Sequence, residues 1–300
     1  MRRLSQARLI SGVLIAAGIF LCTISDIRPS RPASVHGYYV LGADFHVHTA
    51  FGDGGLAPWD AARDAQRRGI DVIAVTNHNQ MLAARIHRRL FGDAGLPLVL
   101  MGQEVTAPHH HILAIGVRSV VDWNQAAAAT IADIHTRGGV AIAAHPHGES
   151  ARDYGDEALQ KLDAVERAHP GMYLKGERRA AFASFFARVR QHHRTVSPVG
   201  DSDFHFTGAI GFCRTDVLAR EISETAVLDA VRNGRTVAYD RDGNAFGEPE
   251  YIAIAEQGGK VRRSAAPSRW AAVGNAIGVS AVWFGLAGLV LLGTSGRSNS

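Results

Sequence analysis

Two histidines end the first apolar stretch of the central sequence at a spacing that suits metal binding. In the segment ADFHVHT, His46 and His48 stand two residues apart, so on an extended strand both side chains leave the same face. Asp53 follows in a glycine-rich turn, FGDGG, where a short carboxylate can fold back over the end of the strand. Imidazole and carboxylate groups are common ligands of divalent metal ions, so this segment predicts part of a metal site.

The same types of side chain recur at four later apolar stretches. His78 stands in AVTNHN, Glu104 in MGQEVT and His145 in AIAAHPHG, while Asp203 and His205 in PVGDSDFH repeat the two-residue spacing. Side chains at the carboxyl ends of neighbouring strands converge, so we expect these five residues to join the first three. A carboxylate such as Glu104 has two oxygens and can bridge two cations.

A run of three histidines leaves one further position open. His109, His110 and His111 come directly before or at the start of the apolar strand HILAIG, and any of them could point into the site. We take His111 as the ligand because it immediately precedes the apolar residues of this strand.

Composition narrows the choice of ligands and partners. Fifteen histidines are many for 300 residues, whereas two cysteines, Cys22 and Cys213, cannot build a disulfide framework or a thiolate metal site. The residues before position 32 and after position 259 hold ten of the 32 Lys and Arg and one of the 28 acidic residues, so the middle carries 22 basic and 27 acidic residues. This acidic middle suits the neutralisation of bound cations and argues against a basic face for duplex nucleic acid.

Short apolar runs alternate with helical patterns between positions 36 and 259. The alternation predicts an α/β fold, either a parallel sheet or a closed barrel, with ligands gathered at the carboxyl ends of the strands. The expected strands span 39–46, 70–76, 98–101, 111–117, 140–144, 162–166 and 196–200. The expected helices lie around 58–68, 81–90, 124–137, 177–192 and 223–233.

Two long apolar runs frame this region. One covers 17 uncharged residues from Leu9 to Ser25 after three arginines, and the other runs from Trp270 to Gly293 with only Asn275 strongly polar. We predict an N-terminal signal or transmembrane anchor over 1–30, a catalytic domain over 36–259 and a C-terminal transmembrane helix over 270–293. The alternatives are a cleaved signal peptide and a buried core helix. The N-terminal arginines favour a membrane-anchored protein with an extracytoplasmic catalytic domain, although basic residues also flank the second run on the domain's own side.

Taken in order, the motifs resemble those of the PHP (polymerase and histidinol phosphatase) family over roughly residues 40 to 236. They are HxHT with a DG turn, T-x-H-N, G-x-E, a histidine that opens a strand, A-H-P and D-x-H. The resemblance implies a distorted (β/α)7 barrel, here flanked by the two predicted transmembrane helices, that holds three divalent ions, with Zn, Mn and Fe all compatible with the ligands.

The resemblance also assigns the ligands to individual ions. It implies a first ion held by His46, His48, Glu104 and Asp203, a second held by Glu104, His111 and His145, and a third held by Asp53, His78 and His205. The first four residues are the expected catalytic set. One position departs from the family pattern, because Asn77 stands where an aspartate is usual. We expect Asn77 to orient His78 without binding metal itself.

Other histidines and arginines are sorted by their place in the sequence. His147, Arg152 and Arg214 are candidate substrate-binding residues, as is Arg167, because a guanidinium pairs well with phosphate oxygens. The remaining histidines we treat as background: they lie near arginines on expected helices or, for His169, beyond a strand end that Glu166 already occupies. They are His87, His135, His169, His192 and His193.

These features predict a metal-dependent hydrolase, specifically a phosphoesterase in which a metal-bridged hydroxide attacks phosphorus. The expected substrate is a small molecule or short oligonucleotide, and no duplex nucleic acid is expected as a partner. Two alternatives stay open. The same site would also suit a carboxyl-ester or carbamate hydrolase, and a non-catalytic PHP module is conceivable, although such modules usually have an eroded ligand set.

Overall fold

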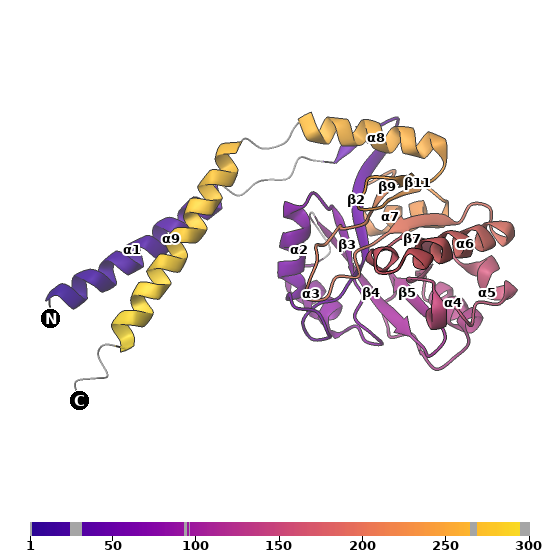
Figure 1. The fold of residues 1–300 in the computed structure, drawn as a ribbon, viewed down its shortest axis with the longest axis horizontal. Helices are drawn as coiled ribbons and strands as arrows, with labels where there is room; N and C mark the ends of the chain where they lie inside the picture. Colours follow the sequence, from indigo (N-terminus) through magenta and orange to yellow (C-terminus); the bar gives the residue numbers. More distant parts are fainter. Residues whose placement is uncertain (1, 25–31, 93–94, 96, 265–268, 295–300) are drawn as a thin grey trace. The chain divides into compact units, whose positions relative to one another are not determined.

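The computed structural model describes residues 2–24, 32–92, 95, 97–264 and 269–294. The chain divides into two compact units, one made of residues 1–30 and 265–300 and the other of residues 31–264. The larger unit contains the sheet, as Figure 1 shows, and its residue range includes all the predicted metal ligands.

A mixed sheet forms the frame of the larger unit. Within the described residues, ten strands follow the order β11-β10-β9-β2-β3-β4-β5-β6-β7-β8, and β1 pairs with β2. Aliphatic and β-branched residues dominate the central strands, as in the fully buried VIAV of β3, which suits burial on both faces. The strands are β1 Ala33–Val35, β2 Tyr38–Val47, β3 Val72–Val75, β4 Leu98–Thr106, β5 His111–Ile115, β6 Val140–Ala143, β7 Ala164–Ala168, β8 Ser197–Gly200, β9 Arg214–Ala219, β10 Thr236–Tyr239 and β11 Ala245–Phe246.

The strand directions correct the predicted (β/α)7 barrel. Strands β2, β3 and β4 run parallel, as do β6, β7 and β8, but β5 is antiparallel to both of its neighbours and β9 is antiparallel to β2. Only residues 107–110 join β4 to β5, whereas a parallel crossover needs about a dozen. The fold is α/β, but a mixed sheet whose main path has ten described strands replaces the predicted seven-stranded barrel.

The two ends of this sheet approach each other, so it is nearly closed into a barrel. At the end of β8 the amide of Gly200 donates to Thr215 Oγ1 on β9 (2.9 Å), and that hydroxyl donates back to the Gly200 carbonyl oxygen (3.0 Å). On β10, Thr236 Oγ1 donates to the Pro198 carbonyl oxygen at 2.8 Å. A Cβ at Gly200 would lie 2.6 Å from the Arg214 carbonyl oxygen, so this approach requires glycine.

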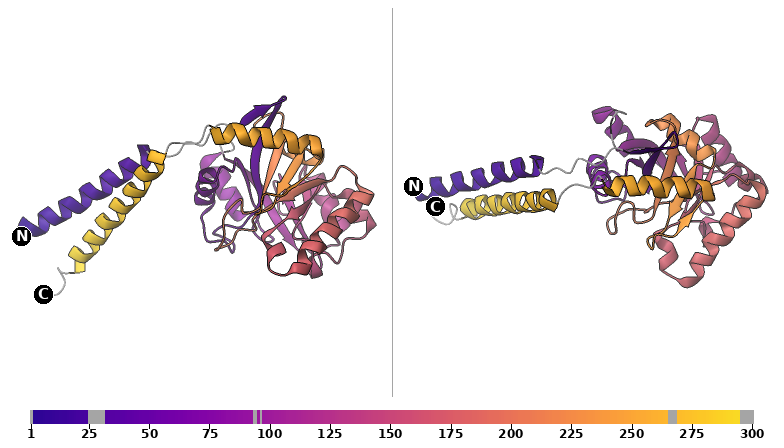
Figure 2. Two further views of the ribbon diagram at one scale, coloured as in Figure 1. Left: turned by 45° about the horizontal axis from the view of Figure 1, so that its top comes forward. Right: turned by 90° about the horizontal axis from the view of Figure 1, so that it is seen from above.

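Helices cover the sheet on several sides (Figures 1 and 2). Their amphipathic faces pack on the strands: Ile131 and Ile134 of α4 join Phe185 and Val189 of α6 in one buried cluster. Side chains of β2 to β9 form a second cluster, which Leu228 and its neighbours on α7 complete. The helices are α2 Pro58–Arg67, α3 Leu82–Phe91, α4 Ala127–Thr136, α5 Asp156–Lys161, α6 Gly176–His192, α7 Glu224–Arg232 and α8 Pro249–Ser264, with short 3₁₀ turns η1 Gly148–Ser150 and η2 Pro170–Tyr173.

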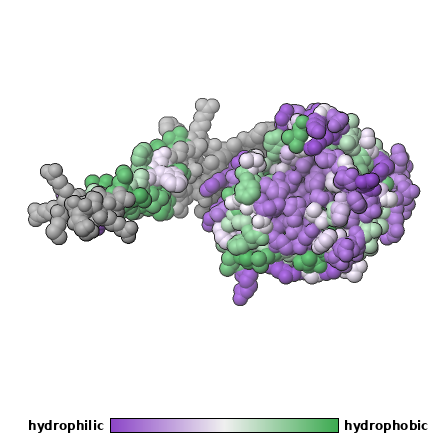
Figure 3. Space-filling view, turned by 60° about the horizontal axis from the view of Figure 1, so that its bottom comes forward, coloured by the Kyte–Doolittle hydropathy of each residue, from purple (hydrophilic) through white to green (hydrophobic). Residues whose placement is uncertain are grey.

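The smaller unit consists of α1 (Arg2–Ile24) and α9 (Arg269–Thr294), which pack closely against each other. Small residues allow the contact, because a Cβ at Gly18 would lie 2.6 Å from the Gly278 carbonyl oxygen and one at Gly285 would lie 2.7 Å from the Ser11 carbonyl oxygen. The described part of this pair is largely hydrophobic on the face in Figure 3, whereas the larger unit is mostly hydrophilic there.

The predicted membrane spans need correction. Among the described residues, no helix combines the length and the apolar character needed to cross a membrane. In α1 the uncharged residues begin after Arg8 and the helix ends at Ile24, which leaves 16 positions against about 20 for a bilayer core. Asn275 and five glycines occupy six of the 26 positions of α9 and add little apolar surface. The anchor over 1–30, the transmembrane helix over 270–293 and the membrane-anchored localisation are therefore not supported.

Candidate metal centre

The nine predicted ligands lie together in one cluster of the larger unit. They come from the end of β2 and the turn after it, the segment after β3, the body of β4, the start of β5 and the segments after β6 and β8. They are His46, His48, Asp53, His78, Glu104, His111, His145, Asp203 and His205. Two of them, His145 (φ 27°) and Asp203 (φ 47°), adopt the left-handed backbone region that non-glycine residues usually avoid. Such strain concentrates at functional sites, where the surrounding structure must hold it in place.

Glu104 is the centre of this cluster and is completely buried. One oxygen, Oε1, lies 2.8 Å from His111 Nδ1 and 3.1 Å from His145 Nε2. The other, Oε2, lies 2.8 Å from His78 Nδ1 and 3.3 Å from Nε2 of both His46 and His48. Each oxygen therefore faces its own set of imidazoles, which suits a carboxylate shared between two metal ions.

His46 and His48 face each other through their nitrogens. Nδ1 of His46 lies 2.7 Å from Glu166 Oε1 and Nδ1 of His48 lies 3.0 Å from Asp53 Oδ1, so each Nδ1 carries the proton of its hydrogen bond. In the neutral rings both Nε2 atoms are then unprotonated, and they lie only 3.0 Å apart. Two lone pairs at this distance repel each other unless a cation or a proton lies between them.

Two buried carboxylate oxygens point into the same space. No aligned hydrogen-bond donor among the described residues reaches Glu104 Oε2 or Asp203 Oδ1, although His78 Nδ1 lies 2.8 Å from Glu104 Oε2. Asp203 Oδ1 lies 3.2 Å from His46 Nε2 and 3.3 Å from His48 Nε2. An unsatisfied buried acceptor costs about 1–3 kcal/mol, and more when it is charged. A divalent cation would satisfy these oxygens and separate the two imidazoles, so the residues present fit bound metal.

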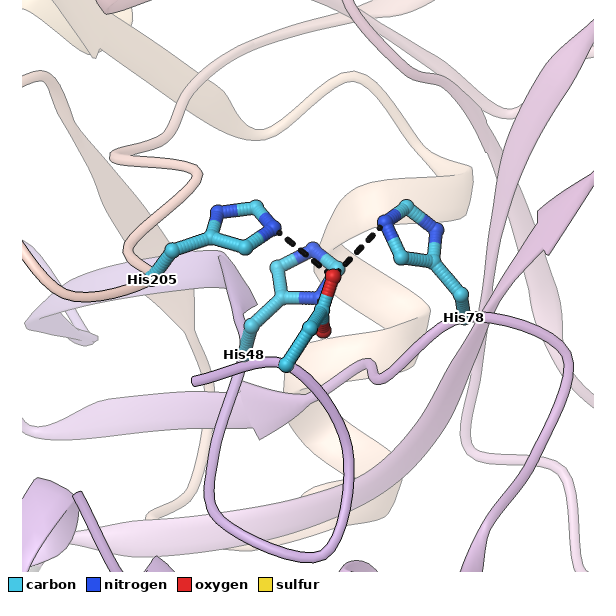
Figure 4. Close-up of side chains that lie close together, drawn as sticks. His48, His78 and His205 are labelled. Atoms are coloured by element: carbon cyan, nitrogen blue, oxygen red, sulfur yellow. Dashed lines mark hydrogen bonds and ion pairs between the residues drawn. The ribbon is translucent and has the colours of Figure 1, made fainter. Parts of the chain in front are cut away.

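A second group lies beside the first and is more exposed. Asp53 Oδ2 lies 3.2 Å from Nε2 of both His78 and His205, as the dashed lines in Figure 4 show. The ring of His48 stacks on that of His205 with centroids 3.9 Å apart. Nδ1 of His205 is 3.0 Å from the Asp203 carbonyl oxygen, so its Nε2 is the nitrogen left for a ligand bond. His48, Asp53, His78 and His205 thus form a compact set of possible metal ligands.

The clustered charges shift pKa values in opposite directions. Burial raises the pKa of Glu104, but His46 and the bonds from His111 and His145 outweigh burial and hold it well below its usual range. Burial lowers the pKa of His48, yet the neighbouring Asp203 and Glu104 outweigh it and raise the value to about 9. The carboxylates are therefore ionised and balanced by protonated imidazole when no metal is bound. Metal binding must displace protons from the site.

Glu166 braces this centre and was not among the residues predicted for it. It is buried in β7, where Oε1 bonds His46 Nδ1 and Oε2 accepts the backbone amide of His145. It therefore fixes the tautomer of one predicted ligand and the backbone of another. The signal in the sequence was a single glutamate at the end of an apolar strand, which has no metal-site spacing of its own.

Two further buried carboxyl groups hold the backbone beside β2. Asp44 accepts the amides of Ser202 (3.1 Å) and Gly211 (2.8 Å), and Asp201 accepts the amide of Phe45 at 2.6 Å. Burial raises the pKa of Asp44 to about 6 and that of Asp201 well above its usual range. These bonds tie β2 to the segment after β8, so they place His46 and Asp203 side by side.

Asn77 stands where the resemblance in the sequence leads one to expect an aspartate. Its Oδ1 accepts the amide of Thr49 at 2.7 Å and its Nδ2 donates to Thr49 Oγ1 at 3.4 Å. The side chain is buried, and these two hydrogen bonds hold the turn that follows His48 rather than the ring of His78. Nδ1 of His78 lies 2.6 Å from Thr106 Oγ1 and 2.8 Å from Glu104 Oε2.

A cavity of about 470 Å³ opens beside the cluster. Its wall includes the predicted ligands His145 and Asp203, and also His147, which was predicted to bind substrate. Arg178 at the start of α6 lines it too, and no ion pair joins its guanidinium to a carboxylate of the described residues. Burial lowers the pKa of His147, and Arg178 adds to that effect, so the ring is neutral near pH 7.

The arginines that were predicted to bind substrate do not line this cavity. Arg152 is exposed and pairs with Glu149 at 2.9 Å, and Arg214 at the start of β9 lies 3.7 Å from Asp216. Arg167 lies over the ring of Phe246, 4.0 Å from its centroid. Arg178 was not among the predicted substrate-binding residues. It lies in an expected helix, far from every strand end, and only the packing of α6 brings it to the cavity.

Comparison with known proteins agrees with this architecture. A family model described as PHP-associated matches residues 185–236. An uncharacterized protein of Methanocaldococcus jannaschii is 28% identical over 138 residues, which are 42% of this chain and 80% of that protein.

Two solved structures share the fold. One is a two-domain protein from Bacteroides vulgatus ATCC 8482, described as containing a predicted PHP-like metal-dependent phosphoesterase (TM-score 0.60, 21% identity, 77% of this chain and 74% of that chain). The other is PsfC from Pseudomonas syringae PB-5123 (TM-score 0.50, 15% identity, 75% of this chain and 98% of that chain).

The buried clusters of His, Asp and Glu fit a metal-dependent hydrolase that uses divalent ions. A PHP-associated family model matches residues 185–236 of this chain, and the ordered motifs from His46 to His205 resemble those of the PHP family. The solved structures show that the fold is shared.

Proposed function

We propose that this chain is a phosphoesterase that works with three divalent metal ions, which are Zn, Mn or Fe. The proposal rests on two buried carboxylate oxygens without an aligned hydrogen-bond donor among the described residues, Glu104 Oε2 and Asp203 Oδ1, each of which lies 3.2–3.3 Å from Nε2 of both His46 and His48. The proposed ligand sets are His46, His48, Glu104 and Asp203 for the first ion, Glu104, His111 and His145 for the second, and Asp53, His78 and His205 for the third.

Bound divalent ions would supply an activated water near neutral pH and would offset the charge on phosphoryl oxygens. The chain's own residues would hold the metal ligands in place. Glu104 keeps two groups of imidazoles at fixed separation through its two oxygens, and Glu166 keeps His46 in one tautomer. Preorganised groups of this kind cost no reorganisation during the reaction.

The neighbouring cavity is where the ester would bind. Arg178 and His147 give it one cation and one neutral polar group, and Leu174 and Phe212 give it apolar surface. A guanidinium without a carboxylate partner suits a phosphoryl oxygen, since it can donate two parallel hydrogen bonds. A volume of about 470 Å³ suits a small molecule or the end of a short oligonucleotide.

A substrate panel on the full-length protein tests the proposal. We expect hydrolysis of p-nitrophenyl phosphate or bis-p-nitrophenyl phosphate in the presence of Mn²⁺ or Zn²⁺, and little turnover of p-nitrophenyl acetate. Glu104→Gln keeps the shape of the side chain but removes its charge and replaces one oxygen with a donor. It should lower kcat/KM at least about a hundredfold and reduce the bound metal per chain.

The matched control is Glu157→Gln, because Glu157 is an exposed glutamate paired with Lys161. It should leave metal content and turnover unchanged. Preferred turnover of the acetate ester would favour the carboxyl-ester hydrolase. Full metal loading without turnover of any ester would favour a non-catalytic module.

A further inference from the structure

His169 is a buried histidine next to the proposed metal centre that none of the three ligand sets uses. It follows β7 and is only 6% exposed. Its Nδ1 accepts the backbone amide of Gly171 at 2.9 Å, which caps the 3₁₀ turn η2. An amide N–H can bond only to an unprotonated nitrogen, so the proton of the neutral ring is on Nε2.

This tautomer decides what His169 can do. By distance alone, His169 forms a possible cation site with His46 and Glu166. Its Nδ1 is already engaged with Gly171 and its Nε2 carries a proton, so neither nitrogen offers a lone pair to a metal. His169 is a hydrogen-bond donor at this place in the structure.

The Nε2–H group has no acceptor among the described residues. The nearest carboxylate oxygens are Asp203 Oδ2 at 3.4 Å and Glu166 Oε2 at 3.9 Å, and neither makes a hydrogen bond with it. A buried donor without an acceptor costs about 1–3 kcal/mol. His169 lines the 470 Å³ cavity, so its free donor faces the place where a ligand would lie.

The ring is held in this orientation from several sides. It stacks on Phe182 of α6, with centroids 5.7 Å apart and planes 19° apart, and its centroid lies 5.3 Å from that of His145. The Gly171 amide fixes one edge of the ring, so the opposite edge cannot turn away from the cavity. A donor fixed before binding is worth more to a ligand than one that must first be ordered.

We propose that Nε2–H of His169 donates a hydrogen bond to a phosphoryl oxygen of the bound substrate, and that the Gly171 amide locks the tautomer that makes this possible. The inference rests on the proposed phosphoesterase function and adds a residue that contacts substrate without binding metal. No proton is transferred, because the same proton stays on Nε2 throughout. The donor stabilises negative charge on the phosphoryl group as the reaction proceeds.

Two substitutions test the roles of Nδ1 and Nε2 of His169 separately. His169→Asn keeps an acceptor near the position of Nδ1 for the Gly171 amide but removes the Nε2 donor. His169→Gln reaches the position of Nε2 with an amide donor but loses the acceptor for Gly171. We expect His169→Asn to lower kcat/KM about a hundredfold and His169→Gln to lower it less than tenfold, with metal content unchanged in both.

Binding of inorganic phosphate to the metal-loaded full-length protein gives a readout that needs no turnover. Calorimetry should show phosphate affinity about tenfold weaker in His169→Asn than in the wild type and nearly unchanged in His169→Gln. The inference is overturned if the two variants lose activity equally, if His169→Asn keeps wild-type affinity and activity, or if it loses a metal ion. A wild type that binds phosphate but hydrolyses no phosphoester would refute the proposed function and still leave the role of His169 to be decided by the two affinities.

Discussion

Glu104 shows at the scale of one residue why this centre needs cations. Its side chain is fully buried, its two oxygens face different imidazoles, and one of them has no aligned hydrogen-bond donor among the described residues. A lone buried carboxylate would usually become neutral, but here the surrounding histidines hold its pKa well below the usual range. The site therefore keeps a negative charge that metal can use.

Arg178 is expected to bind the phosphoryl group of the substrate, which a single substitution can test. Arg178→Ala removes the cation that lines the cavity and should raise KM for a phosphomonoester about tenfold or more, with metal content unchanged. Steady-state kinetics with p-nitrophenyl phosphate would measure this. Arg63→Ala is the matched control, because Arg63 is an exposed helical arginine paired with Asp60. Equal KM values for the two variants would remove Arg178 from the substrate site.

His87 gives a pH prediction outside the metal centre. It is buried on α3 with no partner for Nδ1 among the described residues, and burial lowers its pKa below the usual 6.5. As pH falls below about 6.5, the unfolded chain gains this proton and the folded chain resists it, so the stability that the neutral ring contributes at higher pH is lost. His87→Gln should lose less stability than the wild type between pH 7 and pH 5. Urea unfolding at both pH values measures this difference, and parallel losses would contradict the prediction.

Residue spacing could propose members of the candidate site but not its surroundings. The pairs His46–His48 and Asp203–His205 could be found because a two-residue spacing has a meaning on an extended strand. His87 was expected on a solvated face and is buried, and His169 was treated as background although it contacts the cavity. In both cases the decisive fact is what packs against the ring, and a single sequence does not carry that information.

At the scale of elements, the turn after β2 positions Asp53 by close backbone contact. Gly54 lies so near the strand end that a Cβ on it would be 2.2 Å from the His48 carbonyl oxygen and 2.4 Å from the Thr49 amide nitrogen. The next residue, Gly55, donates its amide to the His205 carbonyl oxygen at 2.7 Å. The turn therefore links two of the proposed ligand segments.

Gly54→Ala should push this turn away from the strand and displace Asp53. We expect the variant to bind about one metal ion fewer per chain and to lose at least about tenfold in kcat/KM, because the Asp53, His78 and His205 set would be broken. Metal analysis with activity assays would show this. Gly155→Ala is the control, since a Cβ there meets nothing within 4 Å and should change neither quantity.

The elements themselves were predicted unevenly. The strands expected at 39–46 and 196–200 appear as β2 and β8 with nearly the same bounds. Strands β9, β10 and β11 were missed: β9 and β10 mix polar with apolar residues, and β11 has only two residues. The direction of each strand relative to its neighbours could not be predicted either. The hydrophobic pattern does not say which strands pair, and the relative direction follows only from the pairing.

At the scale of the whole molecule, the proposed chemistry belongs to one of the two units. All nine proposed ligands and the cavity lie within residues 31–264. A fragment of residues 32–264 should therefore keep the metal content of the full-length chain and a kcat/KM within about twofold. Circular dichroism would establish that it folds. A folded fragment without metal or activity would show that the helices α1 and α9 are needed by the site.

If several divalent ions bind to these clusters, ester hydrolysis should depend on them. The most direct measurement is metal content by plasma mass spectrometry together with phosphoesterase rate, on full-length protein before chelation, after chelation and after stepwise return of Mn²⁺ or Zn²⁺. We expect up to three ions per chain, loss of the rate on chelation and its return as the ions rebind. A chain that holds no ions, or one whose rate survives their complete removal, would contradict this expectation.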